Sequence, residues 1–142
     1  MNEKLQQQLF EQFPELFRTR GRPAKRLDGY GICTGDGWYT LIYELCVQIQ
    51  KHADEKGLQP LALQVKEKFG GLRFYMRGAD AAIDEAVDKA ERLSFQTCEV
   101  CGALGERRYH AWIQTLCDKH DEEYIREHGD DSDAFDDGED KS

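Results

Sequence analysis

The sequence lacks any long run of apolar residues, and its first residues are polar. No window approaches the roughly 18 consecutive apolar residues that a membrane-spanning helix needs. Residues 1–8 contain charged residues and glutamines where a secretory signal would have its apolar centre. We therefore expect a soluble, cytoplasmic protein without a membrane partner.

The chain contains five cysteines among 142 residues. In a cytoplasmic protein such cysteines are interpreted first as thiols or metal ligands and not as disulfides. Cys46 falls on an apolar helical stripe and is expected in the core. Cys33 lies in a glycine-rich loop and is expected to be an exposed thiol.

The formal charge of −9 is concentrated at the carboxyl-terminal end. Residues 118–142 contain twelve acidic and three basic residues, and the rest of the chain is balanced. Within 129–142, Phe135 is the one large apolar side chain, too little to offset the entropy of ordering the segment. We predict a single domain over 1–128 and a disordered acidic tail over 129–142. The tail is expected to serve solubility, with imitation of a nucleic-acid backbone as the alternative.

Apolar spacing predicts three helices before residue 96. In the first, apolar residues recur every four positions until Pro14 interrupts the pattern, at Leu5, Leu9, Phe13 and Phe17. The second is expected to begin with Asp36 as its cap and to end by Gly57. Its buried stripe consists of Trp38, Leu41, Ile42, Leu45, Cys46 and Ile49. The third is expected over about 81–95, with an inward face of Ile83, Val87, Ala90 and Leu93.

After Pro60 the apolar period changes from 3.6 to 2, which predicts a β-hairpin. The first strand is expected to turn a set of apolar residues to the core, namely Leu61, Leu63, Val65 and Phe69. Gly70 and Gly71 are predicted to form the turn, since both can adopt positive φ. Glu67 interrupts the apolar face, and Arg73 is its predicted partner across the hairpin.

The most informative motif lies near the carboxyl-terminal end. Cys98 and Cys101 are two residues apart, fifteen residues follow, and Cys117 and His120 are again two residues apart. Two such pairs supply four donors at the spacing that tetrahedral zinc prefers. We therefore predict that Cys98, Cys101, Cys117 and His120 bind one Zn²⁺ ion.

The spacer indicates the shape of the zinc module, about residues 96–128. Residues 106–109 and 111–115 are predicted to form a short hairpin, and 118–128 a polar helix whose first turn includes Cys117 and His120. A Cys-Cys turn, a hairpin and a helix form a treble-clef-like zinc finger. Because protein donors occupy all four positions, no activated water has a place, and the zinc is predicted to be structural.

Treble clefs also host histidine-dependent nucleases, so His110 and His128 require attention. A nuclease needs a second metal site with an additional Asn or His, and no Asn follows Asn2. We expect His110 to be an exposed strand residue and His128 a cation at the end of a helix.

A basic segment precedes the second helix. Its sequence from Arg20 to Pro23, Arg-Gly-Arg-Pro, resembles the core of an AT-hook, a peptide that lays arginines along the minor groove of A·T-rich DNA. The resemblance implies that Arg20 and Arg22 would read the groove. The phosphate contacts would come from Arg18, Lys25 and Arg26. The alternative is a basic loop that balances acidic residues elsewhere, including the tail.

Over residues 30–120 the chain resembles a group of small uncharacterised proteins of bacteria and their phages and prophages. The matching stretches are Gly35–Tyr39 with Glu44–Cys46, Val65–Tyr75, Ala90–Glu91, Cys98–Gly102 and Thr115–His120. The group implies no established activity. The Arg-Gly-Arg-Pro segment and the acidic tail look like local departures from it.

These patterns together predict an α+β protein with two amino-terminal helices, a β-hairpin, a third helix and the zinc module. No nucleophile–base pair, phosphate-binding loop or open metal site stands out, so we expect a binding protein and not an enzyme. A protein partner is expected at a surface near the hairpin that includes Trp38, Tyr39, Arg73 and Tyr75. These four are core or rim residues in the alternative interpretation.

The second hypothesis, a DNA-associated accessory factor that binds through residues 18–26, makes a direct prediction. An A·T-rich duplex should be retarded in a gel-shift titration at low salt, and added salt should weaken the complex steeply because phosphate contacts release counterions. Arg22→Ala should reduce the binding. Absence of retardation at low salt would eliminate this hypothesis.

Overall fold

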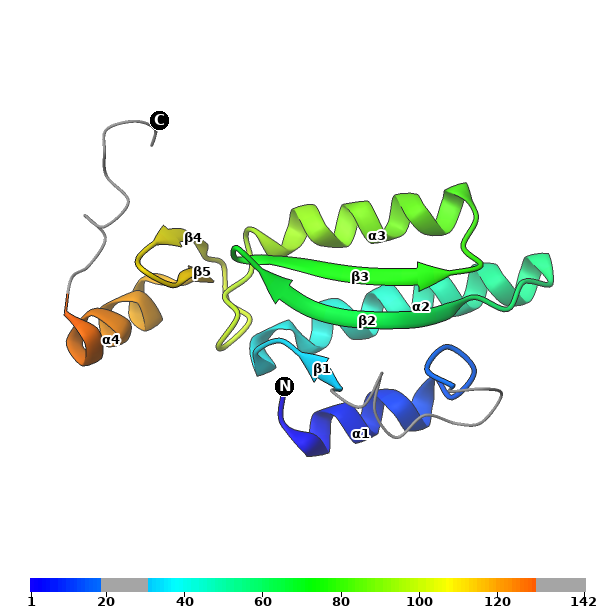
Figure 1. The fold of residues 1–142 in the computed structure, drawn as a ribbon, viewed down its shortest axis with the longest axis horizontal. Coiled ribbons are helices and arrows are strands. Elements are labelled where there is room, and N and C mark those ends of the chain that lie inside the picture. Colours follow the sequence, from blue (N-terminus) through cyan, green and yellow to red (C-terminus); the bar gives the residue numbers. More distant parts are fainter. Residues whose placement is uncertain (19–30, 130–142) are drawn as a thin grey trace.

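The computed structural model describes residues 1–18 and 31–129, which form a mixed α and β fold (Figure 1). The helices of this part are α1 (Glu3–Gln12), the 3-10 turn η2 (Asp36–Trp38), α2 (Tyr39–Lys56), α3 (Ala81–Ser94) and α4 (Asp118–His128). The strands are β1 (Ile32–Cys33), β2 (Leu61–Lys68), β3 (Gly71–Arg77), β4 (Glu106–Tyr109) and β5 (Ile113–Leu116). The predicted acidic tail beyond Gly129 lies outside the described residues, as does the basic segment after Arg18, which includes Arg20, Arg22, Lys25 and Arg26.

Strands β1, β2 and β3 form one sheet in that order. β3 pairs with β2 in antiparallel fashion, as the hairpin prediction requires, whereas β1 pairs with β2 in parallel through Ile32 and Val65. Helices α2 and α3 lie alongside the long strands (Figure 1). Their buried residues and those of the sheet share one core, which includes Ile42, Val65 and Phe74. Strand β1 was not predicted because it is short and lies in the glycine-rich loop.

The first helix agrees with the prediction, since it ends before Pro14. Asn2 caps it, with Oδ1 accepting a hydrogen bond from the Leu5 N–H at 2.8 Å. The predicted cap of α2 is wrong. Asp36 lies in the 3-10 turn, and its carboxylate accepts from the backbone N–H and side-chain amide of Asn2 at 2.8 and 2.9 Å. Asp36 therefore joins the beginnings of two helices and caps neither of them.

The turn between β2 and β3 lies one residue earlier than predicted. Phe69 (φ 55°) and Gly70 (φ 84°) adopt the positive φ values, between the paired residues Lys68 and Gly71. Residue 71 does not adopt positive φ, but it still has to be glycine, because a Cβ there would lie 2.4 Å from the ring of Phe95. As part of the turn, Phe69 is 58% exposed and does not face the core.

Strand β2 also departs from simple alternation. A β-bulge between Ala62 and Gln64 changes the face that the strand presents, so that Ala62 and Val65 are both buried. Leu61 and Leu63, which alternation places inside with Val65, are only half-buried.

The predicted Glu67–Arg73 pair does not form. Glu67 Oε2 accepts a hydrogen bond from the Gly70 N–H at 2.8 Å, within the turn. The Arg73 guanidinium instead pairs with Glu91 of α3 at 2.8 Å. The arginine thus links the edge strand to the helix and not to its own hairpin.

Helix α3 begins at the predicted position. Asp80 caps it by accepting from the Ile83 N–H at 3.0 Å, and its other oxygen lies 2.7 Å from His52 Nε2. The hydrogen bond with His52 is the main cause that lowers the pKa of Asp80. Ile83 is buried as predicted, but Leu93 is 44% exposed, so the inward face is narrower than expected.

Among the described helices, none combines the length and apolarity needed to cross a membrane.

The turn makes a stability prediction. Phe69→Asn should raise the free energy of unfolding by about 0.5–1 kcal/mol, because Asn adopts positive φ with less strain than other non-glycine residues. Chemical denaturation measures the change. Phe69→Ala is the control, since it removes the same exposed ring without relieving the backbone, and equal stability of the two variants would contradict the argument.

Candidate metal centre

The carboxyl-terminal module lies beyond the end of the sheet where β2 turns into β3 (Figure 1). It consists of a turn at residues 98–101, the paired strands β4 and β5, and α4. Cys117 occupies the N-cap position of α4, so His120 lies in the first helical turn on the same side. At the other pair, the Cys98 N–H donates to the Ala103 carbonyl at 2.7 Å, and Gly102 has φ 84°. This local geometry allows both sulfur atoms of the pair to face the helix.

The structure brings together the four residues that the sequence predicted as metal ligands. One donor atom from each of Cys98, Cys101, Cys117 and His120 lies within 4.8 Å of the other three. The sulfur atoms of Cys101 and Cys117 are 3.8 Å apart, and His120 Nδ1 lies 3.7 Å from Cys98 Sγ and 3.3 Å from Cys117 Sγ. This cluster can hold a metal ion, with His120 contributing Nδ1.

The surroundings of Cys98 favour a thiolate. Cys98 is fully buried, which alone would raise its pKa, but hydrogen bonds from the backbone N–H groups of Cys117, Cys101 and Val100 lower it below its ordinary value. Backbone donors directed at a sulfur stabilise its anionic form, and the thiolate is the form that binds metals.

Two glycines allow the Cys98–Cys101 turn to contact the rest of the domain. The Gly37 N–H donates to the Glu99 carbonyl at 2.8 Å. A Cβ on Gly37 would lie 2.4 Å from the Cys98 carbonyl oxygen and 2.6 Å from the Cys101 nitrogen. A Cβ on Gly35 would lie 2.3 Å from the Glu99 carbonyl oxygen. Because these neighbours are backbone atoms, only glycine fits at both positions.

Further hydrogen bonds attach the module at two points. Trp38 is fully buried, and its indole Nε1–H donates to the Thr97 carbonyl at 2.8 Å. Thr115 in β5 donates its hydroxyl to the Gly70 carbonyl at 2.7 Å, so the module also contacts the turn of the β2–β3 hairpin. The candidate metal centre is therefore coupled to the sheet and to the start of α2.

Glu99, between the two ligands of the turn, is a buried carboxyl group that the sequence analysis missed. Its exposed fraction is 5%, and Oε2 accepts a hydrogen bond from the Gly35 N–H at 2.9 Å. Burial raises its pKa to about 7, against the effect of the Gly35 hydrogen bond, and the charge of Glu67 adds to the increase. A carboxylate beside a cysteine in the sequence carries no signal of burial, because the contact with Gly35 spans 64 residues.

His110 is not the exposed strand residue that the sequence predicted. It follows β4, is 3% exposed, and its Nε2 lies 2.6 Å from Asp121 Oδ1. Its ring stacks on Tyr124 at 4.6 Å, and Tyr124 stacks on His128 at 4.2 Å. His128 lies in the last turn of α4 as predicted. These contacts hold α4 against the hairpin.

Arg108 reinforces this attachment. Its guanidinium lies 2.8 Å from Asp118 and 3.6 Å from Asp121, both on α4, and its Nε donates to the Leu116 carbonyl at 3.1 Å. Burial opposes its charge, but the hydrogen bond with Asp118 and the neighbouring carboxylates raise its pKa above the ordinary value.

The residues predicted for a protein-binding surface do not form one exposed patch. Trp38 belongs to the core, which is the alternative that the sequence left open. Tyr39 is half-buried and stacks on Tyr43 at 6.2 Å, and Arg73 is engaged by Glu91. Tyr75 is 45% exposed.

Arg18 is the one member of the predicted DNA-binding set that the structure describes. Its guanidinium donates to the carbonyls of Glu15 and Pro60 and, at 3.0 Å, to that of Gln59. It therefore joins the segment after α1 to the start of β2, and this contact does not require a phosphate.

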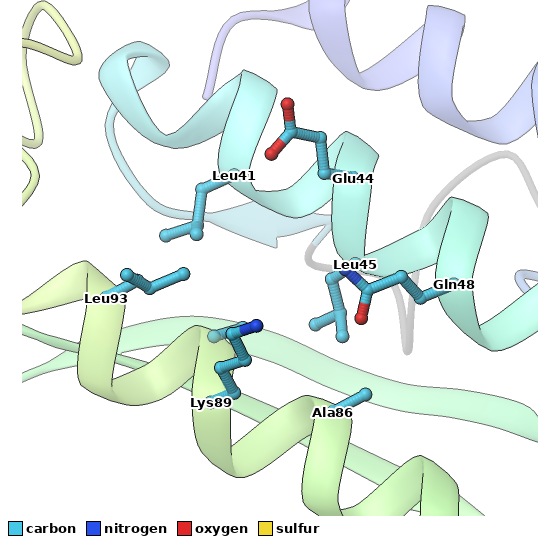
Figure 2. A pocket seen from close by; sticks show the side chains of 8 residues that line it. Leu41, Glu44, Leu45, Gln48, Ala86, Lys89 and Leu93 are labelled. Carbon is cyan, nitrogen blue, oxygen red and sulfur yellow. The ribbon is translucent and has the colours of Figure 1, made fainter.

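The described residues also form a shallow hollow of about 160 Å³ between α2 and α3. Figure 2 shows Leu41, Leu45 and Leu93 around the space between the two helices, with Glu44 and Lys89 beside them. Apolar side chains at a helix–helix contact explain this hollow without a ligand.

Comparison of the chain with protein-family models, curated proteins and solved structures finds no match.

The glycine contacts make a prediction. Gly37→Ala should lower the free energy of unfolding by about 2 kcal/mol or more, because the new Cβ would overlap backbone atoms of Cys98 and Cys101. Urea denaturation of the protein measures the change. The control is Gly57→Ala, which introduces strain at φ 69° but meets no atom within 4 Å. A loss of stability in the Gly37 variant that is no larger than in the control would contradict the overlap with backbone atoms as the cause.

Proposed function

We propose that the protein is a zinc-stabilised binding protein whose activity is recognition of another protein and not catalysis. In this proposal, Cys98, Cys101, Cys117 and His120 hold one structural Zn²⁺ ion. The ion keeps the 98–101 turn in contact with the loop before α2. The cytoplasm, where thiols stay reduced, is the proposed location.

The distances within the cluster support zinc. A tetrahedral ion with Zn–S bonds of about 2.3 Å and a Zn–N bond of about 2.0–2.1 Å places sulfur atoms about 3.8 Å apart, and sulfur and nitrogen about 3.6 Å apart. The corresponding distances are 3.8 Å for Cys101 and Cys117, and 3.7 and 3.3 Å from His120 Nδ1 to two sulfurs. Three thiolates and an imidazole also suit zinc better than magnesium or calcium, which prefer oxygen.

The donor set supports a structural role. Four protein donors complete a tetrahedron and leave no position for an activated water. The order of a Cys-Cys turn, a β-hairpin and a helix with two ligands at its start supports the treble-clef assignment. The buried core of the module consists of Cys98, Leu116 and Tyr124. A core of this size stabilises little by itself, so metal binding would supply much of the folding free energy.

The observation that carries the proposal is the coupling of this cluster to the domain through the Glu99–Gly37 and Thr115–Gly70 hydrogen bonds. The ion would thereby shape a surface to which the turn, the loop before α2 and the hairpin all contribute. A rigid surface of this kind suits recognition of a folded partner. The proposal includes a host protein as the partner in a phage or mobile-element setting, on the basis of the resemblance noted in the sequence.

Loss of zinc tests the proposed structural metal site. Native mass spectrometry of the chain purified without chelator should show one zinc per molecule. Cys117→Ser should lose the ion and at least about 3 kcal/mol of unfolding free energy, because metal binding and folding are coupled. Cys33→Ser is the matched control and should retain both. A fully folded protein without metal would overturn the proposal.

Binding experiments test the proposed recognition of a protein partner. Affinity capture by the zinc-loaded protein should return one partner that forms a stoichiometric complex when both proteins are purified and mixed. Cys117→Ser should abolish the complex and Cys33→Ser should not. If both variants bind equally, zinc does not shape the recognition surface.

A further inference from the structure

A second feature of the module is a hollow of about 460 Å³ beside the metal cluster. The Cys98–Cys101 turn contributes Glu99 and Val100 to its lining, the loop before α2 contributes Thr34 and Asp36, and β2 contributes Glu67. Three parts of the chain that are distant in sequence therefore meet there. None of the metal ligands lines it, so it is distinct from the metal site.

The lining is acidic. The lining includes the carboxyl groups of Asp36, Glu67 and Glu99. No lysine or arginine of the described residues lines the hollow. Both oxygens of Asp36 accept hydrogen bonds from Asn2, so Asp36 is already engaged. The amino group of Met1 also lies there and donates to the carbonyls of Thr34 and Ile32. Glu67 and Glu99 each accept one backbone hydrogen bond, Glu67 Oε2 from the Gly70 N–H and Glu99 Oε2 from the Gly35 N–H. The other oxygen of each carboxyl group is left to meet a ligand.

A buried oxygen of Glu99 without a hydrogen-bond partner indicates that the hollow binds a hydrogen-bond donor. Only 5% of the residue is exposed, and its Oε1 accepts no hydrogen bond from the described residues. Leaving a buried acceptor unsatisfied costs about 1–3 kcal/mol, and more for a charged group. Most buried polar atoms have a partner, so a donor that enters the hollow would supply what this oxygen lacks.

Apolar and aromatic groups form the rest of the wall. Trp112, between β4 and β5, is 55% exposed, and Val100 is 47% exposed. Trp112 and Glu67 also line an adjoining hollow of about 280 Å³ that includes Phe69. An indole face beside carboxylates attracts a cation that has a flat, weakly hydrated surface.

We propose that this hollow binds an arginine side chain presented by the protein partner. The guanidinium would donate to Glu99 Oε1 and to the Glu67 carboxylate, while its plane would stack on Trp112. Arginine fits better than lysine because its planar fork of five N–H donors reaches two carboxylates and still offers a face to an aromatic ring. This inference deepens the proposed function and rests on it.

The test uses the zinc-loaded, ¹⁵N-labelled full chain and the peptide acetyl-Gly-Arg-Gly-amide. Titration should shift the indole N–H signal of Trp112 and the amide signals of Gly35 and Glu99. The control peptide carries citrulline, which has nearly the shape of arginine without its charge. Its affinity should be at least about tenfold lower, as expected for the loss of charge-assisted hydrogen bonds.

Variants identify the groups responsible. Glu67→Gln, Glu99→Gln and Trp112→Ala should each weaken arginine binding at least about threefold, because each removes a charged or stacking contact. Glu55→Gln removes an exposed charge on α2, outside the hollow, and should change the affinity less than about 1.5-fold, as expected for a distant screened charge.

Native mass spectrometry of the same sample verifies zinc content, and dispersed amide signals verify the fold. In a folded, zinc-loaded protein, absence of shifts would overturn the arginine site and leave the proposed function intact. Equal binding of the citrulline peptide would also overturn it, as would a Glu55→Gln effect as large as that of Glu67→Gln. If Glu99→Gln does not fold, the Glu67 and Trp112 variants decide.

Discussion

The close backbone contact between the Cys98–Cys101 turn and the loop at Gly35 and Gly37 is the constraint on which the arrangement depends. The Gly37 N–H bonds to the Glu99 carbonyl, and there is no room for a side chain at either glycine. A contact of this kind tolerates little displacement because backbone atoms cannot rotate away as side chains can. It positions the carboxyl-terminal module relative to the sheet and to α2.

The module contributes few apolar residues of its own to a core, whereas the larger domain buries residues from three helices and the sheet. Its stability therefore has to come from other sources. The stacked rings of His110, Tyr124 and His128 and the ion pairs of Arg108 are two of these sources. A metal ion held by the cluster of three cysteines and a histidine would be a third. Such contacts are directional, so they fix the orientation of α4 relative to the β4–β5 hairpin.

The same contact explains why a carboxyl group is buried. Glu99 follows Cys98 directly, so once the turn is docked its side chain has to lie against Gly35. One oxygen gains a backbone donor and the other does not. Burial without full compensation raises the pKa of this group to about 7, and a buried polar atom without a hydrogen-bond partner is uncommon in proteins.

The sequence by itself determined the features that depend on local spacing. These are the four metal-ligand candidates, the extent of α1 and α3, the end of α2 at Gly57, and the presence of two hairpins, because helix and strand periods and short turns involve residues that are near in the chain. The tertiary structure decided the rest. The turn lies at Phe69 and Gly70, one residue earlier than predicted, and Gly71 lies in β3 against the ring of Phe95. Asp36 bonds to Asn2 instead of capping α2. His110 and Glu99 are buried by contacts with Asp121 and Gly35, which are distant in the sequence. The residues next to them in the chain do not indicate this burial, because it depends on which elements meet in the folded protein.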